Sequence, residues 1–153
     1  MKNMRVLVTG AAGFVGAATT QKLLDRGDDV VGIDNLNPYY DPKLKADRIE
    51  RLSGNDRFEF IQMDCADQDK MAKLFRNGTF DTVVHLAAQA GVRYSLEHPF
   101  AYLEANLNGF LTVLEGCRHH GIKHLVYTSS SSVYGSNQNL PFSVADNVDH
   151  PLS

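Results

Sequence analysis

Three glycines follow the first strand-like segment at a spacing suited to binding phosphate. They are Gly10, Gly13 and Gly16, in the stretch VTGAAGFVG. Between a strand and a helix, this spacing permits a tight turn, close approach of the backbone to a pyrophosphate, and close helix–strand packing. The first helical turn, with Phe14 and Val15, offers unpaired N–H groups and the positive end of the helix dipole. The stretch therefore predicts a dinucleotide-binding turn.

Acidic residues follow the next two strand-like segments. Asp34 ends the stretch VVGID, eighteen positions after Gly16. A carboxylate there can accept hydrogen bonds from the ribose of an adenosine and would repel a 2′-phosphate, so the expected cofactor is NAD rather than NADP. Asp64, with Cys65 beside it, is expected to face the adenine amino group, although Asp64 could also be an ordinary turn residue. The small residues Ala87 and Ala88 would let the cofactor approach the backbone.

Strand and helix patterns alternate along the chain and would position these residues. We expect strands at 5–9, 30–33, 58–63, 82–86 and 125–128. Helices are expected at 13–26, 43–52, 67–76 and 100–120, the second of them charged and exposed, and only loops after 128. This alternation predicts an α/β fold, a Rossmann-type doubly wound parallel sheet with strand order 3-2-1-4-5, over the single domain 1–153.

Composition excludes several classes of function. The chain has 153 residues, a net charge of -3 and no basic patch, so nucleic acid is not an expected partner. No apolar run is long enough to span a bilayer and no signal peptide precedes the first strand, so we expect a cytoplasmic protein. Cys65 and Cys117 fit no metal or redox spacing, and His85 is interpreted as a core histidine.

Five stretches together resemble the extended short-chain dehydrogenase/reductase superfamily, and within it the NAD-dependent nucleotide-sugar epimerase/dehydratase family. They are TGAAGFVG, DNLN, HLAAQAGVRYS, NLNGFLTVLEGCR and YTSSSSVYG. The motifs occur in the family's order and cover essentially the whole chain. The resemblance implies NAD as cofactor and a UDP-sugar as substrate. Within the family, the stretches are most similar to enzymes that act on UDP-glucuronate. This similarity implies interconversion of UDP-glucuronate and UDP-galacturonate for polysaccharide synthesis.

The resemblance also implies roles for individual residues. Ser130 corresponds to the hydroxyl that hydrogen-bonds the sugar and assists proton transfer. Substrate contacts carry over to Arg93, Ser131 and Ser132. Further cofactor contacts carry over to Asn35, Asn37, Leu86, Asn106, Thr128 and Ser129.

The family's general base, the tyrosine of a Tyr-x-x-x-Lys motif, has no counterpart in these 153 residues. We therefore expect the chain to correspond to the N-terminal half of such an enzyme and to have negligible turnover alone. We also expect the last strand to form an exposed apolar edge, which favours a homodimer or other self-association.

Two other functions remain open. One is a standalone NAD-binding module without catalysis. The other is a related UDP-sugar epimerase or dehydratase. The dehydratase is disfavoured because Ser131 and Ser132 stand where such enzymes carry an Asp-Glu pair.

Overall fold

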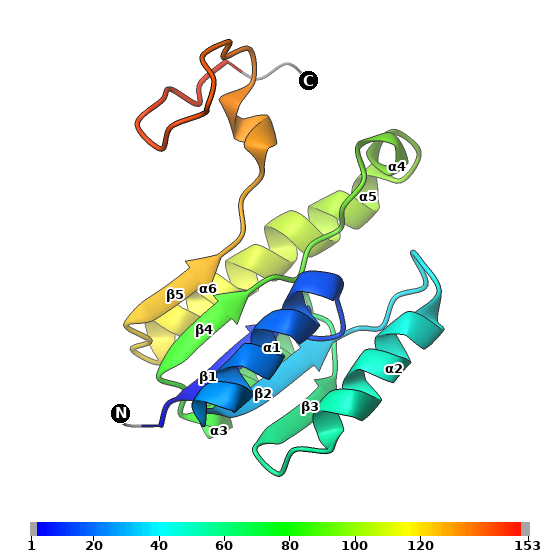
Figure 1. The fold of residues 1–153 in the computed structure, drawn as a ribbon, viewed down its shortest axis with the longest axis vertical. Coiled ribbons are helices and arrows are strands. Elements are labelled where there is room, and N and C mark those ends of the chain that lie inside the picture. The colour runs from blue at the N-terminus through cyan, green and yellow to red at the C-terminus, as the bar shows by residue number, and fades with distance from the viewer. Residues whose placement is uncertain (1–2, 151–153) are drawn as a thin grey trace.

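The computed structural model describes residues 3–150, which form a parallel five-stranded sheet with helices on both faces (Figure 1). The strands are β1 (Arg5–Thr9), β2 (Asp29–Asp34), β3 (Phe58–Gln62), β4 (Thr82–His85) and β5 (His124–Tyr127). Every strand pair is parallel, and the order is β3-β2-β1-β4-β5. The predicted doubly wound fold and strand order are confirmed.

The side chains of β1 alternate between two buried layers. Val6 and Val8 pack against α1 (Phe14–Arg26) and α2 (Pro42–Ser53). Leu7 points to the opposite face, where α3 (Gln68–Gly78) and α6 (Gly109–His119) cover the sheet. Because both faces are covered, the central strands are apolar throughout rather than alternating with polar residues.

Local signals in the sequence fix the ends of several helices. Helix α1 ends at Gly27, whose φ of 94° is the left-handed conformation that glycine adopts without strain. The Asp67 carboxylate caps α3 by accepting from the Lys70 N–H, as predicted. The Asp41 carboxylate caps α2 in the same way through the Lys43 N–H, and Pro42 follows at the first helical position.

The segment between β4 and β5 is less regular than the single helix expected over 100–120. A short helix α4 (Val92–Glu97), which the sequence pattern did not predict, comes first. The long helix then begins as α5 (Pro99–Tyr102), continues as the π-helical segment η1 (Leu103–Asn108) and ends as α6. A π-helical turn holds one extra residue and is frequent at functional sites.

Two other expectations were wrong. Helix α2 is not wholly exposed, because Lys45 and Leu52 on it are buried. The chain after β5 is not only loop, because Ser131–Tyr134 form a short 3-10 helix, η2. This last segment leads away from the sheet in Figure 1.

The predicted apolar edge is present at β5. Val126 and Tyr127 are 43% and 56% exposed, and within residues 3–150 this strand pairs only with β4. Of the helices described, none is long and apolar enough to cross a membrane.

Candidate functional site

The glycine turn is held together by close backbone contacts. Gly10 has a φ of 69°, and a Cβ there would lie 2.8 Å from the Ala87 nitrogen. A Cβ at Gly16 would lie only 1.9 Å from the Gly10 carbonyl oxygen, so α1 packs directly on the turn. Gly13 is the N-cap of α1, with no side-chain cap and no acidic residue in the first turn. The start of α1 therefore presents N–H groups that no side chain of its own first turn occupies, which suits a phosphate.

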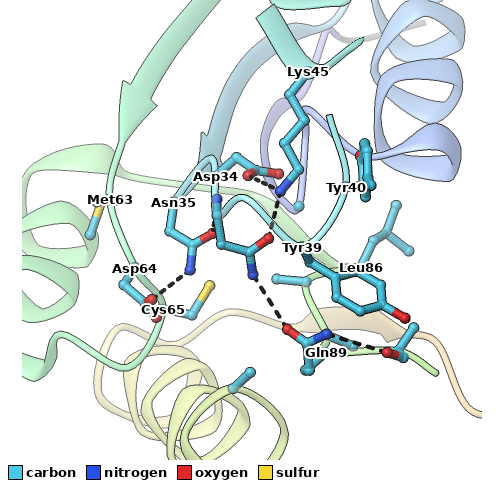
Figure 2. Close-up of a pocket in the computed structure, with 17 residues that line it drawn as sticks. Asp34, Asn35, Tyr39, Tyr40, Lys45, Met63, Asp64, Cys65, Leu86 and Gln89 are labelled. Carbon is cyan, nitrogen blue, oxygen red and sulfur yellow. Dashed lines mark hydrogen bonds and ion pairs between the residues drawn. The ribbon is translucent and has the colours of Figure 1, made fainter. Parts of the chain in front are cut away.

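A cavity of about 180 Å³ opens beside this turn, at the carboxyl ends of β1, β2, β3 and β4 (Figure 2). This is where open α/β sheets bind ligands. Its volume is below the ~300–1,000 Å³ of typical small-molecule sites, so it matches one end of a dinucleotide rather than a whole one. Its walls include these predicted cofactor residues: Gly10, Gly13, Asp34, Asn35, Asn37, Asp64, Cys65, Leu86, Ala87 and Ala88.

Asp34 lies at the end of β2 in the wall of the cavity and is 8% exposed. Its Oδ2 accepts from the Ala12 N–H at 3.2 Å, and its Oδ1 accepts from the Leu36 N–H at 2.8 Å. Lys45 Nζ lies 3.4 Å from the same Oδ1. These contacts fix the carboxylate beside the glycine turn, where the sequence predicted a ribose acceptor.

The loop after β3 brings Asp64 and Cys65 to the same cavity. Asp64 Oδ2 accepts from Asn35 Nδ2 at 2.7 Å (Figure 2). The other carboxylate oxygen, Oδ1, accepts from the Ala66 N–H. Burial, with a smaller effect of the Asp64 charge, raises the pKa of Cys65 to about 12. Cys65 therefore remains a neutral thiol. It could pack against the adenine ring of a cofactor but could not act as a nucleophile.

Asn106 does not line the cavity but holds one of its walls. Its Oδ1 accepts from the Gln89 N–H at 2.8 Å, and its Nδ2 donates to the Gln89 carbonyl at 3.0 Å. Asn106 lies in the π-helical segment η1, while Gln89 belongs to the loop after β4. Asn106 therefore clamps the loop that borders the cavity, and its proximity to the cofactor stays a prediction.

A buried polar pair lies beneath the same loop. The Thr9 hydroxyl oxygen accepts from the N–H groups of Leu86 and Ala87, both at 3.1 Å. It lies 2.8 Å from His85 Nδ1. Because the hydroxyl has one proton and already accepts two bonds, it must donate to Nδ1, so His85 carries its proton on Nε2. Burial lowers the His85 pKa to about 4, so this ring is a neutral core residue, as predicted.

The hydroxyl cluster lies apart from the cavity walls. Thr128, Ser129, Ser130, Ser131 and Ser132 are all exposed and follow β5. The Thr128 N–H donates to the His85 carbonyl, and Ser130 Oγ accepts from the Ser132 N–H and so caps η2. The proposed catalytic and substrate roles of these residues stay predictions.

Four other predicted residues also lie outside the cavity lining. The side chains of Phe14 and Val15 are 81% and 56% exposed at the start of α1, so any contact with phosphate would come from their backbone. Gly16 packs against the Gly10 carbonyl within the turn rather than lining the cavity. Arg93 is exposed on α4, and its substrate role stays a prediction.

Several residues that line the cavity were not predicted. They are Tyr39, Tyr40, Lys45, Met63, Gln89, Ala90 and Ala105. The two tyrosines and Lys45 come from the β2–α2 connection and α2, which the sequence pattern assigned to an exposed region. The sequence did contain one signal for this wall, the two adjacent tyrosines in an otherwise polar loop. Large aromatic side chains usually pack against other groups rather than extend into solvent.

No group of three or more metal-binding side chains occurs among residues 3–150. The polar side-chain groups at the cavity are instead carboxylates, amides, two tyrosine hydroxyls and one ammonium, which suit hydrogen bonding to hydroxyl and amino groups. The free N–H groups at the start of α1, together with Asp34, fit the pyrophosphate and ribose of a dinucleotide.

Known proteins resemble this chain along almost its whole length. An uncharacterized 37.6 kDa protein of Escherichia coli O111:H- is 54% identical over 98% of this chain and 45% of its own length. UDP-glucuronate 4-epimerase 1 of Arabidopsis thaliana is 49% identical over 97% of this chain and 34% of its own. The chain thus spans half or less of these relatives.

A solved structure is similar as well. The UDP-glucuronic acid 4-epimerase of Bacillus cereus, in complex with UDP-glucuronic acid and NAD, superposes with a TM-score of 0.84. It is 39% identical and matches 98% of this chain and 47% of its own. The model of the NAD dependent epimerase/dehydratase family matches residues 6–153. The chain belongs to the NAD dependent epimerase/dehydratase family.

Proposed function

We propose that this chain binds NAD, with the adenosine end of the cofactor in the cavity beside Asp34. The observation that carries the proposal is the juxtaposition of a buried carboxylate with an uncapped helix N-terminus at one edge of the sheet. Gly10 and Gly13 would hold the pyrophosphate, Asp34 the ribose, and Asp64 with Cys65 the adenine. Leu86, Ala87 and Ala88 would form the opposite wall.

We further propose that residues 1–153 are the NAD-binding domain of a UDP-sugar 4-epimerase that interconverts UDP-glucuronate and UDP-galacturonate. The similarity to named UDP-glucuronate 4-epimerases supports this substrate over UDP-glucose. Bound NAD would supply a reversible hydride acceptor. Ser130 would hydrogen-bond the sugar hydroxyl, and Arg93, Ser131 and Ser132 would contact the substrate. Because these residues contain no Tyr-x-x-x-Lys, we expect this stretch to bind cofactor without turnover.

Self-association is part of the proposal. The helix formed by α5, η1 and α6 carries an apolar stripe, and the apolar edge strand β5 lies nearby in the fold. The stripe comprises Phe100, Leu103, Leu107, Leu111 and Leu114, which are between 38% and 80% exposed. Exposed apolar side chains gathered on one helix favour an interaction site. We propose that a second copy of the chain covers it, that the protein is cytoplasmic, and that it acts in polysaccharide synthesis.

Calorimetric titration of the chain with NAD tests the cofactor proposal. NAD should bind more tightly than NADP, and Asp34→Asn should weaken NAD binding about tenfold or more, because a charged acceptor is lost. Asp47→Asn, at an exposed position on α2, is the matched control. Undetectable NAD binding at millimolar cofactor would refute the proposal.

The substrate proposal needs a separate assay on a version of the protein that includes a Tyr-x-x-x-Lys segment. Such a version should interconvert UDP-glucuronate and UDP-galacturonate, and Ser130→Ala should lower its turnover about 100-fold or more. Conversion of UDP-glucose with no activity on UDP-glucuronate would show that the assigned sugar is wrong.

A further inference from the structure

A second hollow, the β3 groove, lies between residues 59–63 and residues 70–78, at the edge of the sheet formed by β3. Its volume of about 450 Å³ falls within the ~300–1,000 Å³ range of typical binding sites and exceeds that of the cofactor cavity. Within residues 3–150 the two hollows share only Met63. β3 lies at the opposite end of the sheet from β5 (Figure 1), so the groove is also distinct from the apolar edge described above.

The backbone of β3 presents free hydrogen-bonding groups at this edge. The Val30 N–H donates to the Arg57 carbonyl at 2.8 Å, so the backbone of the odd-numbered residues here faces β2. By alternation, the N–H and C=O of Phe60 and the N–H of Gln62 face outward. Within residues 3–150 β3 pairs only with β2. These outward groups therefore match the backbone of one further strand.

The floor of the groove is apolar and preformed. Ile61 and Leu74 line it and pack against the buried core on the α3 face of the sheet, and Phe80 lines it as well. The Phe80 ring packs edge-on against Phe75, with 6.0 Å between the ring centroids. Helix α3 also closes on this ring at Gly78, where a Cβ would collide with it. A fixed apolar floor suits an inserted side chain, because little order has to be created on binding.

The rim of the groove carries positive charge that the chain only partly neutralises. Lys70 pairs with Asp67 at 2.8 Å, whereas Lys73 forms no ion pair within residues 3–150. Arg5 Nη2 lies 3.6 Å from the Glu59 carboxylate, beyond hydrogen-bond distance, and within residues 3–150 Arg5 Nε has no hydrogen-bond partner. A chain with a net charge of -3 thus exposes cations here, which favours an acidic ligand.

We propose that the β3 groove binds an extended acidic segment of a partner protein, which adds a strand to the sheet. The backbone of that segment pairs with Phe60 and Gln62. On the α3 face, an apolar side chain lies over Ile61, and the carboxylates two positions before and after it face Arg5 and Lys73. The outward backbone groups select an extended peptide over other anions. The inference does not depend on the binding of NAD.

NMR titration of the labelled chain with synthetic peptides tests the proposal. The probe is the heptapeptide Thr-Glu-Thr-Leu-Thr-Glu-Thr with blocked ends, whose pattern is the same in both directions. At millimolar peptide, the amide signals of Phe60 and Gln62 should shift, and these amides should exchange more slowly with solvent. A peptide with glutamine in place of leucine should bind about tenfold more weakly, because it lacks the apolar side chain. Unmoved Phe60 and Gln62 signals, or equal affinity for the two peptides, would overturn the proposal.

N-methylated peptides separate backbone pairing from attraction between charges. One peptide is N-methylated at its glutamates and leucine, and the other at its threonines. In a parallel added strand the first set of N–H groups faces β3, and in an antiparallel strand the second set does. One peptide should therefore bind about tenfold more weakly while the other keeps its affinity. Equal affinities of the two would exclude strand addition.

A charge reversal tests the rim. Lys73→Glu should weaken binding of the acidic peptide about fivefold or more and strengthen binding of the same peptide with lysine in place of glutamate. Lys22→Glu, at an exposed position on α1, makes the same change in net charge and should leave both affinities unaltered. Equal effects of the two substitutions would show that net charge alone acts and that the groove is not the binding site.

Discussion

The Gly10 carbonyl oxygen occupies the space into which any side chain at Gly16 would project. A Cβ on Gly16 would lie 1.9 Å from that oxygen, and neither partner is a flexible side chain that could move aside. Gly16→Ala should therefore displace α1 from the turn and lower stability by about 1–3 kcal/mol or more. It should also weaken NAD binding, since the helix N-terminus would move. Urea unfolding and calorimetry measure the two effects.

Gly54→Ala is the control for this substitution. Gly54 has an ordinary helical φ of −69°, and a Cβ there would lie 3.6 Å from the Arg51 carbonyl oxygen, an ordinary van der Waals distance. The variant should be neutral or slightly more stable. Equal destabilisation by both alanines would mean that the close packing of α1 on the turn is not the cause.

Asn106→Ala should loosen the loop after β4. It removes both hydrogen bonds to the Gln89 backbone and should lower stability by about 1–3 kcal/mol. Hydrogen exchange at the Gln89 amide should speed up by more than the loss of global stability alone would cause. Asn108→Ala is the control, because within residues 3–150 the Asn108 side chain hydrogen-bonds only to exposed Glu104. Unchanged protection of the Gln89 amide would contradict the clamp.

The depressed pKa of His85 predicts a dependence of stability on pH. Burial lowers this pKa from 6.5 to about 4, so between these values the unfolded chain binds a proton that the folded chain does not. Stability should thus fall as pH drops from about 6.5 to about 4, at up to about 1.4 kcal/mol per pH unit, or about 3 kcal/mol in all. Urea midpoints across this window measure it.

His85→Gln isolates this contribution, because an amide oxygen can still accept from Thr9 but does not titrate. The difference between its pH profile and that of the unaltered chain should have the slope given above. His124→Gln, at an exposed position on β5, should leave the profile unchanged. A His85→Gln profile parallel to that of the unaltered chain would argue against a buried neutral His85.

Cys65 should resist thiol reagents although it borders the cavity. Burial raises its pKa from 9.0 to about 12, so at mildly alkaline pH its thiolate fraction is about a thousandfold below that of an exposed thiol. In a Cys117→Ser background, labelling should be slow in the native chain and fast in concentrated urea. Equally rapid labelling in both conditions would show that Cys65 is accessible and ionised.

The apolar stripe predicts how self-association responds to charge. Leu107→Lys places a cation at a position that is 61% exposed in the middle of the stripe, and it should weaken association without loss of fold. Leu44→Lys, 49% exposed on α2, is the control and should leave association unchanged. Light scattering over a range of concentrations compares them. Monomeric behaviour of the unaltered chain at high concentration would contradict self-association.

Periodicity and glycine placement were enough to predict the sheet and its order. Most strand residues are β-branched or apolar, and the strands alternate with amphipathic helices, so few topologies remained. The position of Asp34 at the cavity could also be predicted, because the carboxyl ends of parallel strands lie at the edge of the sheet where ligands bind. These features depend on local pattern and on a rule that holds for all such folds.

The sequence did not reveal Lys45 or the π-helical segment. A lysine on a charged helix looks like a solvated residue until the tertiary fold brings Asp34 and Asn37 to its amino group. The π-helical turn has no compositional signature, and its Asn106 side chain contacts Gln89 of another segment, the loop after β4. The burial of Lys45 and the contact of the π-helical segment both involve partners on other elements of the fold. Sequence periodicity gives no information about such contacts.

The π-helical segment makes the length of this helix locally adjustable in one direction. Because the π-helical turn holds one residue more than an α-helical turn, a single-residue deletion within Leu103–Asn108 can be absorbed by conversion to a regular α-helix, and α5 and α6 then keep their relative orientation. In a regular α-helix, by contrast, each added or removed residue turns everything after it by about 100°. A single-residue deletion should therefore be tolerated better in this segment than within α6.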